Sequence, residues 1–170
     1  MAVEYTLELF PTTDDIWHSY EGWLGGTDVH RNNDNAGVDL YCVTNQYVQP
    51  GKDATLLDLG VKARMTKRFL DRVYEEPCHF WLAPRSSIWK SGVRQANSLG
   101  VIDRSYRGVL MGAVLVNPAM YEQGYQIEAG TRLFQVLAPD MGYISRVRLR
   151  PESDLDATSR GDGGFGSTGR

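Results

Sequence analysis

The chain has 170 residues, of which 42% are hydrophobic and 23% charged, enough for one domain that buries its own core. Its formal net charge of -3 argues against a general surface for nucleic acid, so any phosphate must be bound by local cations. No apolar run approaches the roughly 20 residues that a membrane span needs. The N-terminus also lacks the pattern of a signal peptide. We therefore expect an intracellular, soluble protein of the cytoplasm or nucleus.

The N-terminal part of the chain predicts a strand followed by a long loop. Residues 3–10 alternate apolar and polar side chains, which is typical of a β-strand. Residues 11–35 are rich in Pro, Thr, Asp, Gly and Asn, and include Trp17, Tyr20 and Trp23. We predict a long loop that these aromatic side chains attach to the body of the protein. A surface for a partner protein is the alternative.

We predict a single helix, in the middle of the chain. Residues 54–61 are strand-like, and residues 62–76 carry apolar side chains at a spacing that fits a short amphipathic helix. Basic and acidic residues are mixed in this segment, which favours a solvated face over a nucleic-acid contact. Cys42 and Cys78 lie in or beside apolar strand-like segments, so we expect free thiols that pack as small hydrophobic groups.

Further strands are predicted in the C-terminal half. Residues 78–83 form a buried-looking strand, and the apolar Val101 and Ile102 lead to Asp103 and then to Tyr106. This pattern predicts a β-hairpin with an acid and an aromatic at its tip. Many short strands with turn signals and one helix indicate an all-β, jelly-roll-like β-barrel.

Two stretches have the composition of phosphate-binding segments. Arg85 is followed by Ser86 and Ser87, which places a planar, two-pronged cation beside short hydroxyl groups. The tail RGDGGFGSTGR has too many glycines for a packed element, and this composition is typical of disorder. We therefore expect a body over residues 1–150 and a flexible C-terminal arm over residues 151–170.

The chain carries five motifs in order: NAGVDLYC at 35–42, PRSS at 84–87, ANSLGVIDRSYRG at 96–108, GTRLFQVLAP at 130–139 and RGDGGFGSTG at 160–169. Together they resemble the homotrimeric dUTP pyrophosphatase (dUTPase) family, which cleaves dUTP to dUMP and pyrophosphate. The resemblance spans most of the chain. It implies the dUTPase-like β-clip barrel, a homotrimer, and a function that lowers dUTP and supplies dUMP for dTTP synthesis.

The resemblance also implies roles for particular residues. Asp103 falls where the family has the aspartate that activates water for in-line attack on the α-phosphorus. Tyr106 would lie under the deoxyribose and leave no room for a 2′-hydroxyl. Asn97 would pair its amide with uracil. The implied substrate-binding residues are Arg85, Ser86, Ser87, Asn97, Gly100, Ile102, Tyr106, Gln135, Arg160, Phe165, Gly166, Ser167 and Thr168.

The implied cofactor is Mg²⁺, bound mainly by the triphosphate, with Asp39 contacting it through water. Arg160 and Thr168 would close on the phosphates and Phe165 would stack over uracil, as the arm orders around its substrate. The resemblance further implies that each site takes the second and fourth motifs from one chain, the hairpin from a second and the arm from a third.

Two other functions stay open at this point. The double serine in PRSS and the position of Lys90 are similar to the related dCTP deaminases, so a dCTP deaminase or a bifunctional dCTP deaminase/dUTPase is the alternative. That family needs a glutamate on the strand after the hairpin, and residues 109–116 contain no acid. The third hypothesis is a trimeric regulator without catalysis that binds partners through residues 11–35.

Overall fold

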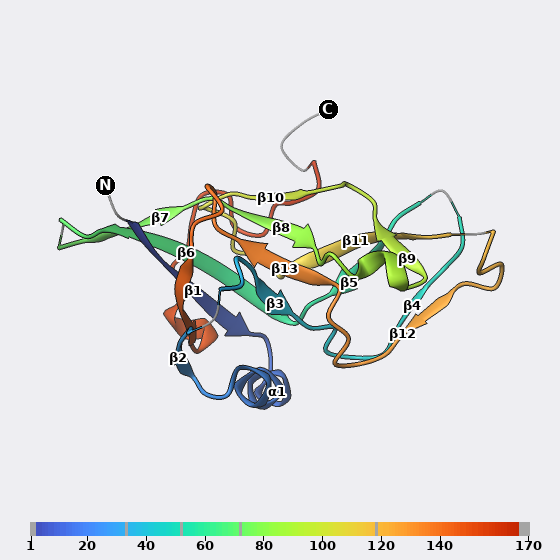
Figure 1. The fold of residues 1–170 in the computed structure, drawn as a ribbon, viewed down its shortest axis with the longest axis horizontal. Helices are drawn as coiled ribbons and strands as arrows, with labels where there is room; N and C mark the ends of the chain where they lie inside the picture. Colours follow the sequence, from blue (N-terminus) through green and yellow to red (C-terminus); the bar gives the residue numbers. More distant parts are fainter. Residues whose placement is uncertain (1–2, 33, 52, 72, 118, 167–170) are drawn as a thin grey trace.

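The structure is a computed structural model that describes residues 3–32, 34–51, 53–71, 73–117 and 119–166. These residues form four β-sheets and one α-helix (Figure 1). The five-stranded sheet has the order β2 (Asp28–His30), β14 (Ile144–Leu149), β1 (Val3–Pro11), β6 (Val61–Phe69) and β7 (Glu75–Cys78). The four-stranded sheet has the order β10 (Gly100–Ile102), β8 (Phe80–Pro84), β13 (Phe134–Leu137) and β3 (Val38–Leu40).

The remaining elements are short. A three-stranded sheet has the order β5 (Thr55–Asp58), β11 (Met111–Val116) and β9 (Val93–Gln95). A two-stranded sheet pairs β12 (Tyr125–Ile127) with β4 (Gln46–Val48). The helices are α1 (Asp14–Leu24) and two single 3-10 turns, η1 (Ile88–Lys90) and η2 (Glu152–Asp154). The mostly-β prediction is therefore confirmed, although the sheets do not close into one barrel in the part of the chain described.

The core lies between the sheets. Leu7 and Leu9 on β1 and Phe134 on β13 have no exposed surface. Burial of side chains of this size contributes about 1.5–3 kcal/mol each. Cys42 and Cys78 are free and buried, as predicted. Burial raises the pKa of both thiols to about 11, so they stay protonated at neutral pH.

Helix α1 occupies much of the segment that we predicted to be a long loop. The Thr13 hydroxyl caps its first turn by accepting a hydrogen bond from the Ile16 backbone N–H at 3.3 Å. Gly25, with φ of 78°, ends it in the left-handed conformation that favours glycine. The loop prediction was wrong because we weighed the polar composition of residues 11–35 above these capping signals.

Tyr20 attaches α1 to the rest of the protein. The side chain is fully buried, and its hydroxyl donates to the Leu59 carbonyl oxygen at 2.8 Å and accepts from the Tyr41 backbone N–H at 3.2 Å. Trp23 stacks on Tyr41, with ring centroids 4.1 Å apart. Burial raises the pKa of Tyr20, so its hydroxyl keeps its proton. The expected attachment by aromatic side chains is therefore confirmed.

The helix predicted over residues 62–76 is also wrong, because this segment forms β6, a turn and β7. Along β6 the side chains of Val61, Ala63 and Met65 are buried and alternate with partly exposed ones. A period of two therefore fits the start of the segment as well as a helical period does. Antiparallel pairing with β1 along the whole of β6 decides between them.

The predicted hairpin around Asp103 is a turn between two sheets. β10 pairs with β8, whereas β11 pairs with β5 and β9, so the two flanking strands belong to different sheets. The turn is closed by a hydrogen bond of 2.9 Å from the Tyr106 backbone N–H to the Asp103 carbonyl oxygen.

Among the described residues, none of the helices has the length and apolar composition that a membrane span requires.

We expect Tyr20→Phe to lower the free energy of unfolding by about 1–3 kcal/mol, because it leaves the buried Leu59 carbonyl and Tyr41 N–H without their partner. Denaturant titration followed by circular dichroism measures the change. Tyr47→Phe is the matched control, since Tyr47 is 49% exposed and its change should stay within about 0.5 kcal/mol. Equal effects of the two substitutions would show that the Tyr20 hydroxyl does not hold α1.

Candidate functional site

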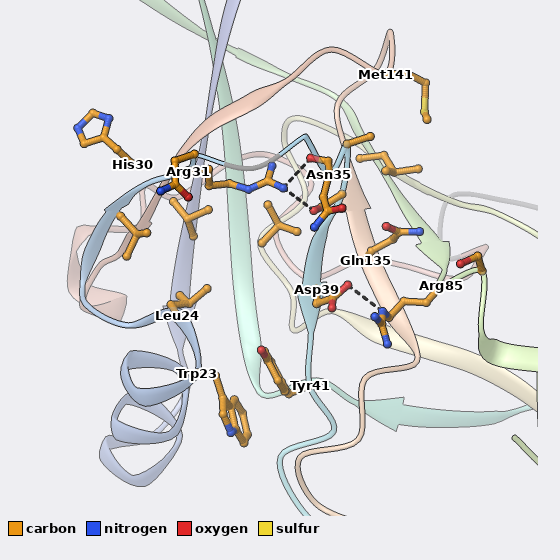
Figure 2. Close-up of a pocket in the computed structure, with 18 residues that line it drawn as sticks. Trp23, Leu24, His30, Arg31, Asn35, Asp39, Tyr41, Arg85, Gln135 and Met141 are labelled. Atoms are coloured by element: carbon orange, nitrogen blue, oxygen red, sulfur yellow. Dashed lines mark hydrogen bonds and ion pairs between the residues drawn. The ribbon is translucent and has the colours of Figure 1, made fainter. Parts of the chain in front are cut away.

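Most of the predicted site residues line one of two cavities. One, which we call the turn cavity, has a volume of about 290 Å³ and lies beside β10. The other, the Asp39 cavity, has a volume of about 550 Å³ and lies beside β3 and β13 (Figure 2). Predicted residues that line the turn cavity are Asn97, Gly100, Ile102, Asp103, Tyr106, Arg160, Phe165 and Gly166. Those that line the Asp39 cavity are Asp39, Arg85, Ser86 and Gln135.

Asp103 lies between a cation of the arm and a histidine. Its Oδ2 atom lies 2.5 Å from Nη1 of Arg160, and its Oδ1 atom lies 3.2 Å from Nδ1 of His79. The same Nδ1 lies 3.2 Å from the Arg104 backbone N–H, from which neutral imidazole can accept. No sequence motif includes His79, so its place beside Asp103 was not predicted.

Tyr106 is fixed by its hydroxyl and by a glycine. The hydroxyl donates to the Val109 carbonyl oxygen at 2.9 Å, and burial raises the pKa of this half-buried side chain. A Cβ atom at Gly108 would lie 2.4 Å from the Tyr106 hydroxyl oxygen, closer than any real contact. Glycine at position 108 therefore allows the ring to lie along the turn cavity.

The arm binds to the turn of its own chain. Gly161 forms a parallel β-bridge with Tyr106, and its carbonyl accepts from the Arg107 backbone N–H at 2.6 Å. The guanidinium of Arg107, which is 8% exposed, reaches the Asp156 carboxylate at 3.1 Å. Burial alone would raise the pKa of Asp156, but hydrogen bonds from Arg107 and Arg64 lower it.

This placement differs from the expectation that the arm closes on a hairpin of another chain, because Arg160 and Phe165 line the same cavity as Asp103 of their own chain. Ser167 and Thr168 lie outside the described residues. The sequence motifs contain Arg107 but did not reveal that its side chain fastens the arm.

The Asp39 cavity gathers arginines around one carboxylate. Arg85 Nε lies 2.9 Å from Asp39 Oδ1, as the dashed line in Figure 2 marks, and Arg132 Nη1 lies 3.2 Å from Asp39 Oδ2. Arg132, which belongs to the fourth motif, was not predicted as a site residue. Ser86 is exposed at the rim, whereas Ser87 lies at the start of the short turn η1.

Gln135 is placed beside Asp39 by strand register. It pairs with Asp39 on β3 and with Ala83 on β8, and its Nε2 donates to the Pro84 carbonyl oxygen at 3.1 Å. A Cβ atom at Gly37 would lie 2.0 Å from Gln135 Oε1, so a larger residue at position 37 would displace the end of this side chain. Arg31 donates to the Gly37 carbonyl oxygen at 2.8 Å and thereby holds the segment that leads into β3.

We expect Gly108→Ala to displace Tyr106, break its bond to the Val109 carbonyl and loosen the Tyr106–Gly161 bridge. Hydrogen exchange should then be faster at the backbone amides of residues 158–163. The free energy of unfolding should fall by about 1–3 kcal/mol. Gly22→Ala in α1, where a Cβ atom meets nothing within 4 Å, should instead stabilise by about 0.5–1 kcal/mol. Unchanged exchange in the arm would refute this role of Gly108.

Comparison with known proteins gives one consistent family. A family model described as dUTPase matches residues 29–169. A deoxyuridine 5′-triphosphate nucleotidohydrolase of Clostridium tetani is 31% identical over 142 residues, covering 83% of this chain and 87% of the relative. That of Variola virus is 33% identical over 134 residues, covering 79% of each.

The fold agrees with a solved structure of the same family. A mutant dUTPase from phage phi11 of Staphylococcus aureus is 14% identical, with a TM-score of 0.51 over 90% of this chain and 96% of that one. The fold is thus shared although most side chains differ. Because the family model covers most of its residues, this chain belongs to the dUTPase family.

Proposed function

We propose that this protein hydrolyses dUTP to dUMP and pyrophosphate, which lowers dUTP and supplies dUMP for dTTP synthesis. The family match supports the reaction, and both curated relatives named above are deoxyuridine 5′-triphosphate nucleotidohydrolases. The observation that carries the proposal is the turn cavity. This cavity is lined by the carboxyl group of Asp103, the aromatic ring of Tyr106 and the amide of Asn97.

Asp103 is the proposed general base. It takes a proton from a water molecule whose oxygen attacks the α-phosphorus, and the bond from that phosphorus to the bridging oxygen of the pyrophosphate breaks. In the structure, Arg160 neutralises this carboxylate at 2.5 Å. A triphosphate offers Arg160 more negative charge, so transfer of Arg160 to the phosphates frees Asp103 Oδ2 for the proton.

The rest of the turn cavity is proposed to recognise the nucleoside. Tyr106 lies under the deoxyribose and Asn97 pairs with the base, while Phe165, which is 61% exposed, is available to cover it. Gly100 and Ile102 belong to β10, an edge strand whose outward backbone groups can meet the base. We propose that residues 151–170 act as an arm, with Gly166, Ser167 and Thr168 completing the closure over residues 1–150.

The Asp39 cavity is proposed to hold the phosphates and to border Mg²⁺. Arg85 supplies a forked cation, and Ser86, Ser87 and Gln135 supply neutral hydrogen-bonding groups near it. The phi11 relative is described with a coordinated structural Mg(II) ion. Here Asp39 is a single carboxylate with lone pairs left beyond its two arginine contacts, which fits contact through water with a metal carried by the triphosphate. When bound, Mg²⁺ supplies positive charge to the phosphate oxygens.

We propose that the protein is a homotrimer whose sites are shared between chains. Within one chain β10 and β3 are separated by β8 and β13, which means three interstrand steps of about 4.8 Å. Asp103, which follows β10, lines the turn cavity, whereas Asp39 on β3 lines the other cavity together with Arg85. Closed three-fold symmetry can bring the turn cavity of each chain against the Asp39 cavity of a neighbour.

A panel of nucleoside triphosphates tests the reaction. With Mg²⁺, dUTP should release pyrophosphate and dUMP. Pyrophosphate release from UTP, dCTP and dTTP should be at least about 100-fold slower. Ammonia from dCTP would instead support the deaminase, which the absence of acids from residues 109–116 disfavours. A protein that binds dUTP without releasing pyrophosphate would be a regulator and not an enzyme.

Asp103→Asn should abolish turnover while leaving dUTP binding largely intact, because an amide keeps the shape of the carboxylate but cannot accept the proton of water. Positioned acid-base groups contribute about 10²-fold or more. Stopped assays of pyrophosphate give the rate, and calorimetry gives the affinity. Turnover within about tenfold of the parent would remove Asp103 from the mechanism.

Mixing two inactive variants tests the shared site. Subunits with Asp103→Asn and subunits with Arg85→Ala, refolded together, should form some sites that take Asp103 from one chain and Arg85 from another. Random mixing at equal amounts predicts recovery of about one quarter of the parent activity. Asp103→Asn mixed with Asp103→Ala is the control and should recover none. If mass spectrometry shows mixed trimers and no activity returns, each chain must hold its own complete site.

A further inference from the structure

The turn cavity contains one buried amide that the proposed mechanism does not use. Gln95, the last residue of β9, lines this cavity and is 9% exposed. Its Oε1 atom is buried and has no hydrogen-bond partner in the described part of the chain. A buried acceptor without a partner is unfavourable, so an apolar side chain of the same length would pack better here. The contacts of the other end of the amide, Nε2, must therefore explain why position 95 carries glutamine.

The Gln95 amide connects a fixed backbone acceptor to Asn97. Its Nε2 atom donates to the Leu82 carbonyl oxygen at 3.2 Å and to Asn97 Oδ1 at 2.9 Å. The Leu82 carbonyl can only accept, so it fixes which end of the Gln95 amide is the NH₂ group. Rotating that amide by half a turn would place Oε1 against two other acceptors. The orientation of Gln95 then fixes the orientation of Asn97.

With Oδ1 held by Gln95, Asn97 presents its NH₂ group on the other side. Asn97 is exposed, and a Cβ atom at Gly100, which also lines the cavity, would lie 3.8 Å from Nδ2. A base in this cavity therefore meets a donor. Uracil offers an acceptor at O4, whereas cytosine offers an amino donor at the same place. A freely turning amide can suit either base, but a fixed one cannot.

We propose that Gln95 is a positioning residue that sets base specificity, because it holds the Asn97 amide with its donor toward the base and so favours uracil over cytosine. The inference rests on the proposed binding of the base by Asn97. Gln95 lies outside the reacting groups. Its effect should therefore appear in the ratio of affinities for dUTP and dCTP, and not in the rate of the chemical step.

Two near-isosteric substitutions separate this role from simple packing. Gln95→Met makes no hydrogen bonds and frees the Asn97 amide to turn. Gln95→Glu, when ionised, can only accept, so Asn97 should turn its NH₂ group toward position 95 and present Oδ1 to the base. Binding of dUTP and dCTP with Mg²⁺ is measured by calorimetry in an Asp103→Asn background, which does not turn substrate over.

We expect Gln95→Met to lower the preference for dUTP over dCTP by at least about tenfold, and Gln95→Glu to lower it further by improving dCTP binding. Gln126→Met, at an exposed position on β12, is the matched control and should change neither affinity. A preference unchanged in both Gln95 variants overturns the proposal. Weaker binding of both nucleotides by the same factor also overturns it, because that result indicates packing alone.

Asn97→Ala distinguishes failure of this inference from failure of the proposed site. If Asn97→Ala leaves the preference unchanged, Asn97 does not read the base. If it lowers the preference and the Gln95 variants do not, only the role of Gln95 is refuted. Should the Gln95 variants not fold, side-chain amide NMR of the Asp103→Asn protein decides. The Asn97 NH₂ signals should shift on binding dUTP while the Gln95 NH₂ signals stay protected, and exchange-labile Gln95 signals would overturn the proposal.

Discussion

The pairing of β8 with β10 on one side and β13 on the other is the constraint on which both cavities depend. Leu82 faces the turn cavity from the middle of β8, and Arg85 enters the Asp39 cavity directly after the end of the same strand. The two cavities therefore share one rigid element but lie toward different edges of its sheet. In Figure 1, β10 and β3 lie on opposite sides of β8 and β13. Within one chain, the residues proposed to bind the nucleoside and those proposed to bind the phosphates therefore line separate cavities.

Three arginines pair with the carboxylates that line the two cavities. Arg85 and Arg132 pair with Asp39, and Arg160 pairs with Asp103. These contacts keep the guanidinium groups oriented although the protein as a whole is negatively charged. Phosphate oxygens can replace the carboxylates as partners of these cations. In the mechanism that we propose, the same exchange at Arg160 would free Asp103.

The sequence allowed much of the turn cavity to be predicted. The motif residues Asn97, Asp103 and Tyr106 are close in the chain, so local geometry brings them together once β10 and the following turn form. Arg160 and Phe165 come from a distant segment, and only the family resemblance connected them to that cavity. The division of the motif residues between two cavities depends on sheet order, which no local pattern reveals.

The wrong and missing predictions have separate physical causes. Helix α1 was missed because composition outweighed its caps, and β6 was taken for a helix because pairing with β1 cannot be seen locally. His79 and Gln95 lack a motif signal, since His79 contacts Asp103 of another segment and Gln95 donates to the Leu82 carbonyl oxygen on β8 as well as to Asn97. Arg132 and Arg107 lie inside motifs, but their partners Asp39 and Asp156 are distant in sequence.

We propose that one nucleotide is bound by the turn cavity of one chain and the Asp39 cavity of another. The most direct test is a crystal structure with Mg²⁺ and the α,β-imido analogue of dUTP, which cannot be cleaved at the α-phosphorus. We predict uracil beside Asn97, deoxyribose on Tyr106, and phosphates on Arg85 of a neighbouring chain. A nucleotide whose base and phosphates contact a single chain, or whose phosphates lie away from Arg85, would contradict this account.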